Sequence, residues 1–337
     1  MLNLNVKPFR TVAAFVCFFV LAGGFGIQSI GTKALSAERM RVALPDKSFG
    51  QLPLFIGIRA GLFKDESLDI QWILIRSNVI APALVAGEID VAAAAGSTMR
   101  VAARGAPLKA IFFPFYKSTF VFVGAPEIKR VQDLKGKVIG TTGPRNSTQI
   151  AASMVLQRHG LNPDKDVTFF TVGGGETILA ALETKTIHAM AVNPDMAFLM
   201  KKKGFRELAF LADLAPWPWG GYATSDVKLL QERDKIKRWM RAMVKSVVLM
   251  ANNKEETMRI AMAEFGYPRD VTEAAANVST KAINSQAPGG AEENILRQNI
   301  ELTITAPLEL KESPSVAKLV DFSLLREVWK ELGIAAR

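Results

Sequence analysis

Small polar side chains recur in this chain directly after short apolar segments. Gly96-Ser97-Thr98 follows the apolar residues 89–95, and Asn193-Pro194-Asp195 follows residues 187–192. If each apolar segment is a buried strand and each polar group opens a helix, helix N–H groups and nearby hydroxyls could together hold an anion. Neutral donors achieve this without burying an unpaired full charge, which would cost several kcal/mol. The pattern therefore predicts a site for a small anion or zwitterion.

The predicted ligand contacts lie between strands and the helices that follow them, or on the segments that cross between the two halves of the chain. They are Gln51, Ser77, Asn78, Gly96, Ser97, Thr98, Lys117, Thr141, Thr142, Ser147, Thr148, Asn193, Asp195 and Tyr222. The loops 46–51 and 173–176 belong to the same set. Arg145 is a further candidate cation. We expect Ser97 and Thr142 to face each other across a cleft.

These residues also have structural interpretations. Ser97 or Ser147 could serve only as a helix N-cap, and residues 141–144 could form only a turn. Lys117 and Arg145 could face solvent. Asp195 would repel an anion, so either it pairs with one of these two cations or the ligand carries an amine.

Aromatic residues near the second crossing leave a similar choice. Trp217, Trp219 and Tyr222 could wall the pocket or could only pack at a hinge.

Residues suited to catalysis or to metal binding are sparse. The single cysteine, Cys17, lies near the N-terminus, and the two histidines, His159 and His188, lack the cysteine or acid spacing of a metal site. The glycines at 173–175 lack the third spaced glycine of a dinucleotide fingerprint. We expect no catalytic residue, no metal and no cofactor.

The N-terminal segment has the composition of a secretory signal peptide. Lys7 and Arg10 precede the apolar residues 12–22, small residues follow, and no acid occurs before Glu38. A single membrane anchor is the alternative. The residues before Cys17 do not resemble a lipoprotein cleavage site. We predict a signal peptide at 1–37 and a periplasmic protein that is not a lipoprotein.

Composition indicates a globular protein of about two domains. The 337 residues are 49% hydrophobic and 22% charged, with a net charge of +10 that becomes +7 once Lys7, Arg10 and Lys33 are removed. The basic residues are scattered, so we expect no nucleic-acid partner.

Strand and helix patterns alternate from residue 40 onward, and the order runs twice. A shift of 98 residues overlays residues 42–44 on 140–142 and residues 68–70 on 166–168, although chance could produce such an overlay. After Ser225 the patterns are helical. We expect these helices to pack back onto the first half. The predicted lobes are 38–125 plus 223–337, and an inserted lobe at 126–222. Residues 118–124 leave the first lobe, and the hinge lies at 123–125 and 222–224.

Five motifs in this order resemble the nitrate/sulfonate/taurine (NMT1/SsuA-like) family of periplasmic solute-binding proteins of ABC importers. They are Gly61-Leu62-Phe63-Lys64, Ser67-Leu68-Asp69-Ile70, residues 83–90, residues 104–109 and residues 133–137. The similarity spans residues 40–211. It implies a type II periplasmic binding protein-like fold, with two Rossmann-like α/β lobes joined by two hinge crossings.

The resemblance also implies a function. It predicts a monomer that captures a small solute, such as a sulfonate, nitrate, taurine or a related oxyanion or zwitterion, and delivers it to an ABC permease at the membrane. Two alternatives stay open. One is an enzyme resembling the thiamine-pyrimidine synthases, although these use a histidine and a cysteine-rich segment, and the mature chain has no cysteine. The other is an exported ligand sensor.

Overall fold

The computed structural model describes residues 37–173, 176–214, 217–218 and 220–335. The predicted signal segment lies outside these residues except for its last position. The interpretations of Gly174, Gly175 and Trp219 also lie outside them. Across the described ranges, no helix combines the length and the apolar character that a membrane span requires.

The first sheet has five strands in the order β2-β1-β3-β10-β4. Their bounds are Glu38–Leu44 (β1), Leu68–Leu74 (β2), Val91–Ala92 (β3), Leu108–Phe112 (β4) and Tyr222–Ser225 (β10). β1 pairs in parallel with β2 and β3, whereas β10 is antiparallel to β3 and β4. Alternate residues of β1 enter different cores: Val42 and Leu44 pack in one, and Ala43 packs in another. The consecutive apolar residues 42–44 at the end of β1 therefore reflect a sheet that is covered on both faces.

The second sheet has the order β7-β6-β8-β5-β9. Its strands are Val121–Gly124 (β5), Val138–Thr141 (β6), Thr168–Thr171 (β7), Ala189–Val192 (β8) and Arg206–Phe210 (β9). β6 pairs in parallel with β7 and β8, and β5 is antiparallel to β8 and β9. Phe122 packs on one face of this sheet, and Val121 and Val123 pack on the other.

The two sheets share one topology, which confirms the internal repeat. Each residue of β1 pairs with the residue 30 positions later in β2, and the same offset joins β6 to β7. In each sheet, the antiparallel strand (β10 in the first, β5 in the second) takes the same place in the order. The two halves are therefore similar α/β units.

Sheet pairing differs from the expectation for the two crossing strands. Residues 118–124 were predicted to leave the first lobe, but β5 pairs along both edges inside the second sheet. Tyr222, assigned above to the inserted lobe, begins β10 of the first sheet. The crossings between sheets are therefore residues 113–120 and 211–221. The predicted hinge positions lie within strands or directly beside them. The proposed lobes 38–125 plus 223–337 and 126–222 stay a prediction.

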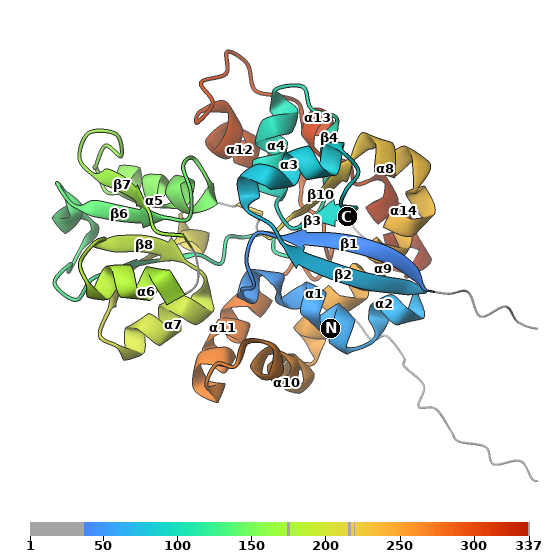
Figure 1. Ribbon diagram of the computed structural model, residues 1–337, viewed down its shortest axis with the longest axis horizontal. Helices are drawn as coiled ribbons and strands as arrows, with labels where there is room; N and C mark the ends of the chain where they lie inside the picture. Colours follow the sequence, from blue (N-terminus) through green and yellow to red (C-terminus); the bar gives the residue numbers. More distant parts are fainter. Residues whose placement is uncertain (1–36, 174–175, 215–216, 219, 336–337) are drawn as a thin grey trace, which may run out of the picture. The chain divides into compact units, whose positions relative to one another are not determined.

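Helices cover both faces of each sheet (Figure 1). The α-helices are Leu52–Arg59 (α1), Leu62–Asp65 (α2), Ser77–Val85 (α3), Ala95–Ala103 (α4), Ser147–Arg158 (α5), Glu176–Glu183 (α6), Pro194–Lys202 (α7), Asp226–Gln231 (α8), Arg233–Asn252 (α9), Lys254–Phe265 (α10), Arg269–Lys281 (α11), Glu293–Ile300 (α12), Val316–Leu319 (α13) and Ser323–Glu331 (α14). Short 3₁₀ segments are Phe49–Gln51 (η1), Val131–Leu134 (η2) and Leu211–Asp213 (η3), and Glu301–Thr305 (η4) is a π-helical turn. Trp239 and Val247 of α9 share a core with Val42, so the C-terminal helices return to the first sheet as expected.

The stretch around α3 and α4 contains a left-handed glycine and a strand shorter than predicted. Gly87 adopts the left-handed conformation after α3, with φ of 73°, as a helix C-terminus favours. The strand predicted at 89–95 is shorter, because α4 already begins at Ala95. The N–H of Thr98 donates to the Ala94 carbonyl, and the N–H of Ala95 donates to that of Gly221. Gly96-Ser97-Thr98 is therefore the first turn of α4 and not a loop before it.

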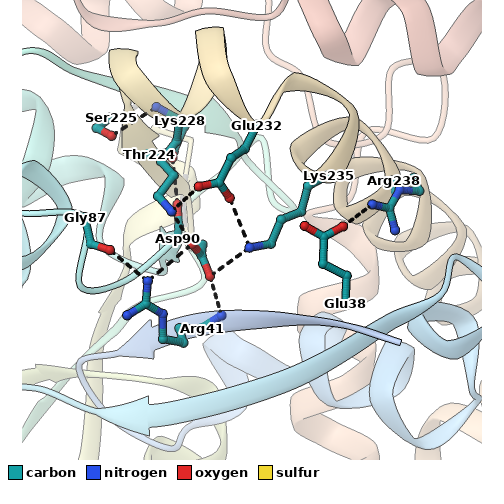
Figure 2. A network of polar contacts seen from close by, with 10 residues as sticks. All are labelled: Glu38, Arg41, Gly87, Asp90, Thr224, Ser225, Lys228, Glu232, Lys235 and Arg238. Carbon is teal, nitrogen blue, oxygen red and sulfur yellow. Dashed lines mark hydrogen bonds and ion pairs between the residues drawn. The ribbon is translucent and has the colours of Figure 1, made fainter. Parts of the chain in front are cut away.

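A buried ionic network joins the returning chain to the first sheet (Figure 2). Asp90, 1% exposed, lies directly before β3 and accepts from Lys228 Nζ at 2.7 Å and from the Arg41 N–H at 2.7 Å. Lys235 of α9 is 3.4 Å from the same carboxylate, and the Thr224 hydroxyl donates to the Asp90 carbonyl. Asp90 lies at the amino-terminal end of β3, whereas the predicted ligand loops follow the carboxyl ends of the strands. The network therefore lies at the opposite end of the strands from those loops. Its role is to hold β10, α8 and α9 in place.

Candidate functional site

The first turn of α4 contains a buried hydroxyl without a partner. Thr98 is fully buried, and its Oγ1 has no hydrogen-bond partner within the described part of the chain. The neighbouring Ser97 Oγ donates to the Ala94 carbonyl at 3.0 Å. The N-cap is Ala94, which has no side-chain oxygen, so the prediction of a hydroxyl N-cap here was wrong. Thr98 is left available for a ligand.

Arg100 lies one turn further along α4, and sequence reasoning missed it. A side chain on Gly96 would meet the Arg100 Nη1 at 3.9 Å, so the guanidinium lies over the first turn of the helix. Burial lowers the pKa of Arg100 to about 10, and no ion pair or hydrogen bond to its side chain is found in the ranges the structure describes. A half-buried guanidinium at the positive end of a helix dipole would be stabilised by a bound anion.

The loops of the first sheet converge near the second crossing. A side chain at Gly220 would lie 3.2 Å from the Gly50 carbonyl and from Phe115, and one at Gly221 would lie 2.7 Å from Ala95. Glycine is required here because the backbone of one crossing passes against the other. This contact brings together the loop after β1, the start of α4 and both crossings.

Gln51 and Tyr222 bind each other beneath these loops. The Tyr222 hydroxyl donates to Gln51 Oε1 at 3.2 Å, and both side chains are buried. The Tyr222 ring packs against Trp239, with centroids 5.1 Å apart. Burial raises the pKa of the Tyr222 phenol, so it stays neutral at every physiological pH. Of the two interpretations given for Tyr222, wall of the pocket or packing residue, this structure shows the packing residue.

The first turn of α5 forms a compact polar cluster. Its N-cap is Asn146, whose Oδ1 accepts from the Gln149 N–H and from the Thr148 hydroxyl. Thr148 Oγ1 accepts from the Thr142 N–H at 3.0 Å, and the Asn146 amide donates to the Thr142 hydroxyl. Ser147 is therefore not the cap. Ser147 is half-buried, and its hydroxyl makes no hydrogen bond within the described part of the chain.

The first turn of α7 contains two unpartnered acceptors. Asn193 is the N-cap residue by backbone conformation, but its side chain makes no capping bond. Its Oδ1 and the Asp195 Oδ1 are both buried, and neither has a hydrogen-bond partner within residues that the structure describes. Asp195 is only 2% exposed. Of the two alternatives for Asp195, the ion pair with Arg145 or Lys117 is not formed: no ion pair to Asp195 occurs among the described side chains.

The surroundings of Asp195 are acidic rather than basic. Burial raises the pKa of Asp195 to about 6, opposed by hydrogen bonds from the Tyr267 hydroxyl and from the N–H groups of Asp195 and Met196, and the charge of Asp46 raises it further. The pKa of Asp46 is itself raised, chiefly because protein atoms surround its carboxyl group even though solvent still reaches it. Two carboxyl groups, one from the loop after β1 and one from α7, thus lie close enough to interact.

The remaining predicted residues make few contacts with this region. Ser77 and Asn78 are exposed at the start of α3. Lys117 lies on the first crossing with its Nζ 5.2 Å from the Tyr116 ring centroid. Arg145 is exposed, and its backbone has a positive φ of 52°. Thr141 is buried at the end of β6.

Contacts between α7 and α11 join the second sheet's helices to the C-terminal region. Lys202 pairs with Asp270 at 2.5 Å, and Phe198 packs against the core that surrounds the first sheet. A shallow pocket of about 340 Å³ lies at this contact, lined by Phe198, Lys201, Lys202, Asp270, Val271 and Ala274. None of these is a predicted ligand residue, so this pocket lies apart from the predicted site.

Three residues near the site were not among the predicted contacts: Arg100, Asp46 and Tyr267. Asp46 lay in a predicted loop but was not singled out. Arg100 could have been found from its spacing, because it follows Gly96 by one helical turn. Tyr267 offered no signal, because it belongs to a helical region far along the chain.

Comparison with solved structures gives the class of the fold. A protein from Bordetella bronchiseptica RB50 superposes with a TM-score of 0.75 at 21% identity, covering 88% of this chain and 98% of that one. The periplasmic aliphatic sulphonate binding protein SsuA from Escherichia coli gives 0.67 at 17% identity, covering 86% and 99%. The periplasmic nitrate-binding protein NrtA from Synechocystis PCC 6803 gives 0.72 at 14% identity, covering 89% and 90%. The chain has the two-lobed periplasmic binding protein fold.

Sequence comparison gives the family. Residues 48–257 match the family described as NMT1/THI5 like, so this chain belongs to that family. No curated protein matches.

Proposed function

We propose that this protein is the exported solute-binding component of an ABC import system. It captures a small oxyanion or zwitterion between two lobes and passes it to a membrane permease without converting it. The family and the fold support a solute-binding role. Structural relatives that bind sulfonates and nitrate support the solute class.

The observation that carries this proposal is the placement of unpartnered polar atoms. Five buried side-chain polar atoms in the described residues lack a partner, and Thr98 Oγ1, Asn193 Oδ1 and Asp195 Oδ1 are three of them. All three lie on the first turns of α4 and α7, which occupy equivalent places after β3 and β8. Buried polar groups are nearly always hydrogen-bonded. Their concentration at the carboxyl ends of strands, where α/β folds bind ligands, indicates a site completed by a solute.

A thermal-shift panel tests the proposal. The compounds are nitrate, alkyl sulfonates, taurine, aromatic acids and pyrimidines, each incubated with the mature protein. A compound at a hundredfold excess over its Kd stabilises the folded state by about 2.7 kcal/mol, which should raise Tm by roughly 5 °C for a chain of this size. Thr98→Val should reduce the shift by about half or more, because one lost hydrogen bond weakens binding about tenfold. If no compound raises Tm while one of them is consumed, an enzyme replaces the binding protein as the better interpretation.

A further inference from the structure

The buried polar atoms without a partner at the first turn of α7 are both acceptor oxygens. Asn193 Oδ1 and Asp195 Oδ1 are the atoms left without partners, and an ionised carboxylate can only accept hydrogen bonds. Each buried acceptor without a donor costs about 1–3 kcal/mol. A ligand that binds here must bring hydrogen-bond donors.

The charges around this turn also favour a ligand that brings hydrogen-bond donors. The titratable groups that face Asp195 are Asp46, from the loop after β1, and Tyr267, which precedes α11. Lys47 follows Asp46 in sequence but does not neutralise it. Its Nζ lies 3.2 Å from Glu264 and over the rings of Phe55 and Trp72.

The two basic side chains of α7 lie at its C-terminal end: Lys201 is exposed and forms no ion pair within the described residues, and Lys202 is engaged. Lys202 pairs with Asp270 of α11, two turns away from Asp195. No cation in the described part of the chain therefore balances Asp195 and Asp46.

We infer that the solute carries a protonated amine, and that Asp195 and Asn193 bind this ammonium group. An ammonium group has three N–H donors and one positive charge, so it would satisfy both orphaned oxygens and oppose the negative charge of Asp46. Nitrate or a plain alkanesulfonate has only acceptors, and would set negative charge against a buried carboxylate. The inference rests on the proposed function and narrows its solute class to amino-substituted acids.

Equal-length probe pairs that differ only in the amine test this inference. Isothermal titration would compare 3-aminopropane-1-sulfonate with propane-1-sulfonate, and 4-aminobutyrate with butyrate, at pH 7.5. In at least one pair, we expect the amine to bind tenfold or more tightly than its partner. Asp195→Asn should remove that preference. Asp213→Asn, an exposed change in η3 of the same half, should keep it.

A pH series separates ammonium binding from a purely structural role of Asp195. The burial of Asp195 places its titration near pH 6 in the free protein, so the preference for the amine should weaken between pH 7.5 and pH 5 in the wild type. In Asp195→Asn the ratio should stay flat.

Two outcomes would overturn the inference. If the amine-free member of each pair binds as tightly as its partner, the ammonium assignment fails while the proposed solute-binding function stands. If neither pair binds, the assignment also fails. The thermal-shift panel then decides separately whether the protein binds nitrate, aromatic acids or pyrimidines, and so whether the proposed function survives.

Discussion

Asp195, to which we assign a binding role by proposal, carries a stability cost in the free protein. Its carboxyl group is almost completely buried, one oxygen has no partner within the described chain, and Asp46 adds like charge. The folded protein therefore holds the Asp195 proton more tightly than the unfolded chain does. Between pH 4 and pH 6 the folded state binds more protons, so the free energy of unfolding falls as pH rises through this window. Above pH 6 the full cost is present.

Replacing Asp195 by Asn should stabilise the free protein at neutral pH. Asn cannot ionise, and a pKa raised from 3.8 to about 6 corresponds to roughly 3 kcal/mol at pH 7.5. We expect a higher free energy of unfolding for Asp195→Asn in urea titrations at pH 7.5 and near equality with the wild type at pH 4. Asp213→Asn should match the wild type at both. If Asp195→Asn is less stable at pH 7.5, the carboxylate has a partner in solution that this structure does not show.

At the scale of elements, one residue at the start of α5 stabilises the helix and its neighbour stays available for a ligand. Asn146 caps the helix and links Thr142 with Thr148, whereas Ser147 has no part in the cap. The backbone of Arg145 is left-handed just before this cap. The turn is therefore ordered by its own side chains before any ligand arrives, which leaves the Ser147 hydroxyl available.

Alanine substitutions at neighbouring positions should separate these two roles. Asn146→Ala should lower the free energy of unfolding by about 1 kcal/mol, because the cap is lost. Ser147→Ala should change it by less than about 0.5 kcal/mol. Urea denaturation followed by circular dichroism measures both. An equal loss in the two variants would show that Ser147 supports the helix and that the Asn146 cap is not the dominant bond.

At the scale of the whole molecule, the placement of β5 in the second sheet and of β10 in the first determines where a hinge can lie. Each strand is held along both edges in a sheet, so neither can bend freely. The segments 113–120 and 211–221 connect the sheets and are the places where a hinge could lie. Gly220 and Gly221 pass against Phe113, Phe115 and Gly50 there, so larger side chains would obstruct the crossing.

Solute binding should make the protein more compact through these segments. Small-angle scattering with the compound of largest thermal shift should give a smaller radius of gyration than the free protein. Gly221→Val should reduce that change, because the ideal Cβ position already lies 2.4 Å from the Phe113 ring. Gly105→Ala, far from the crossings, controls for a general loss of stability, because its φ of 103° makes any side chain there strained. An unchanged radius in the wild type would contradict hinge closure.

Much of the fold follows from local pattern. Apolar segments such as residues 187–192 and the glycine at 87 predict strands and helix ends, because burial and backbone sterics act on neighbouring residues. The 98-residue repeat likewise predicts two units of one topology. For the site, local pattern points to the ends of β3, β6 and β8, where hydroxyls and amides follow apolar strands, and this stays a prediction.

The sequence by itself therefore determined the family, the order of the elements and the loops that surround the candidate site. Only the tertiary structure decided which sheet receives β5 and β10, because strand pairing joins residues far apart in the chain. It also decided that Tyr222 binds Gln51, that Arg100 lies over Gly96 and that Tyr267 meets Asp195. Whether a polar atom has a partner depends on every element packed around it. For that reason the unpartnered oxygens of Thr98, Asn193 and Asp195, which define the candidate site, emerge only once the chain is folded.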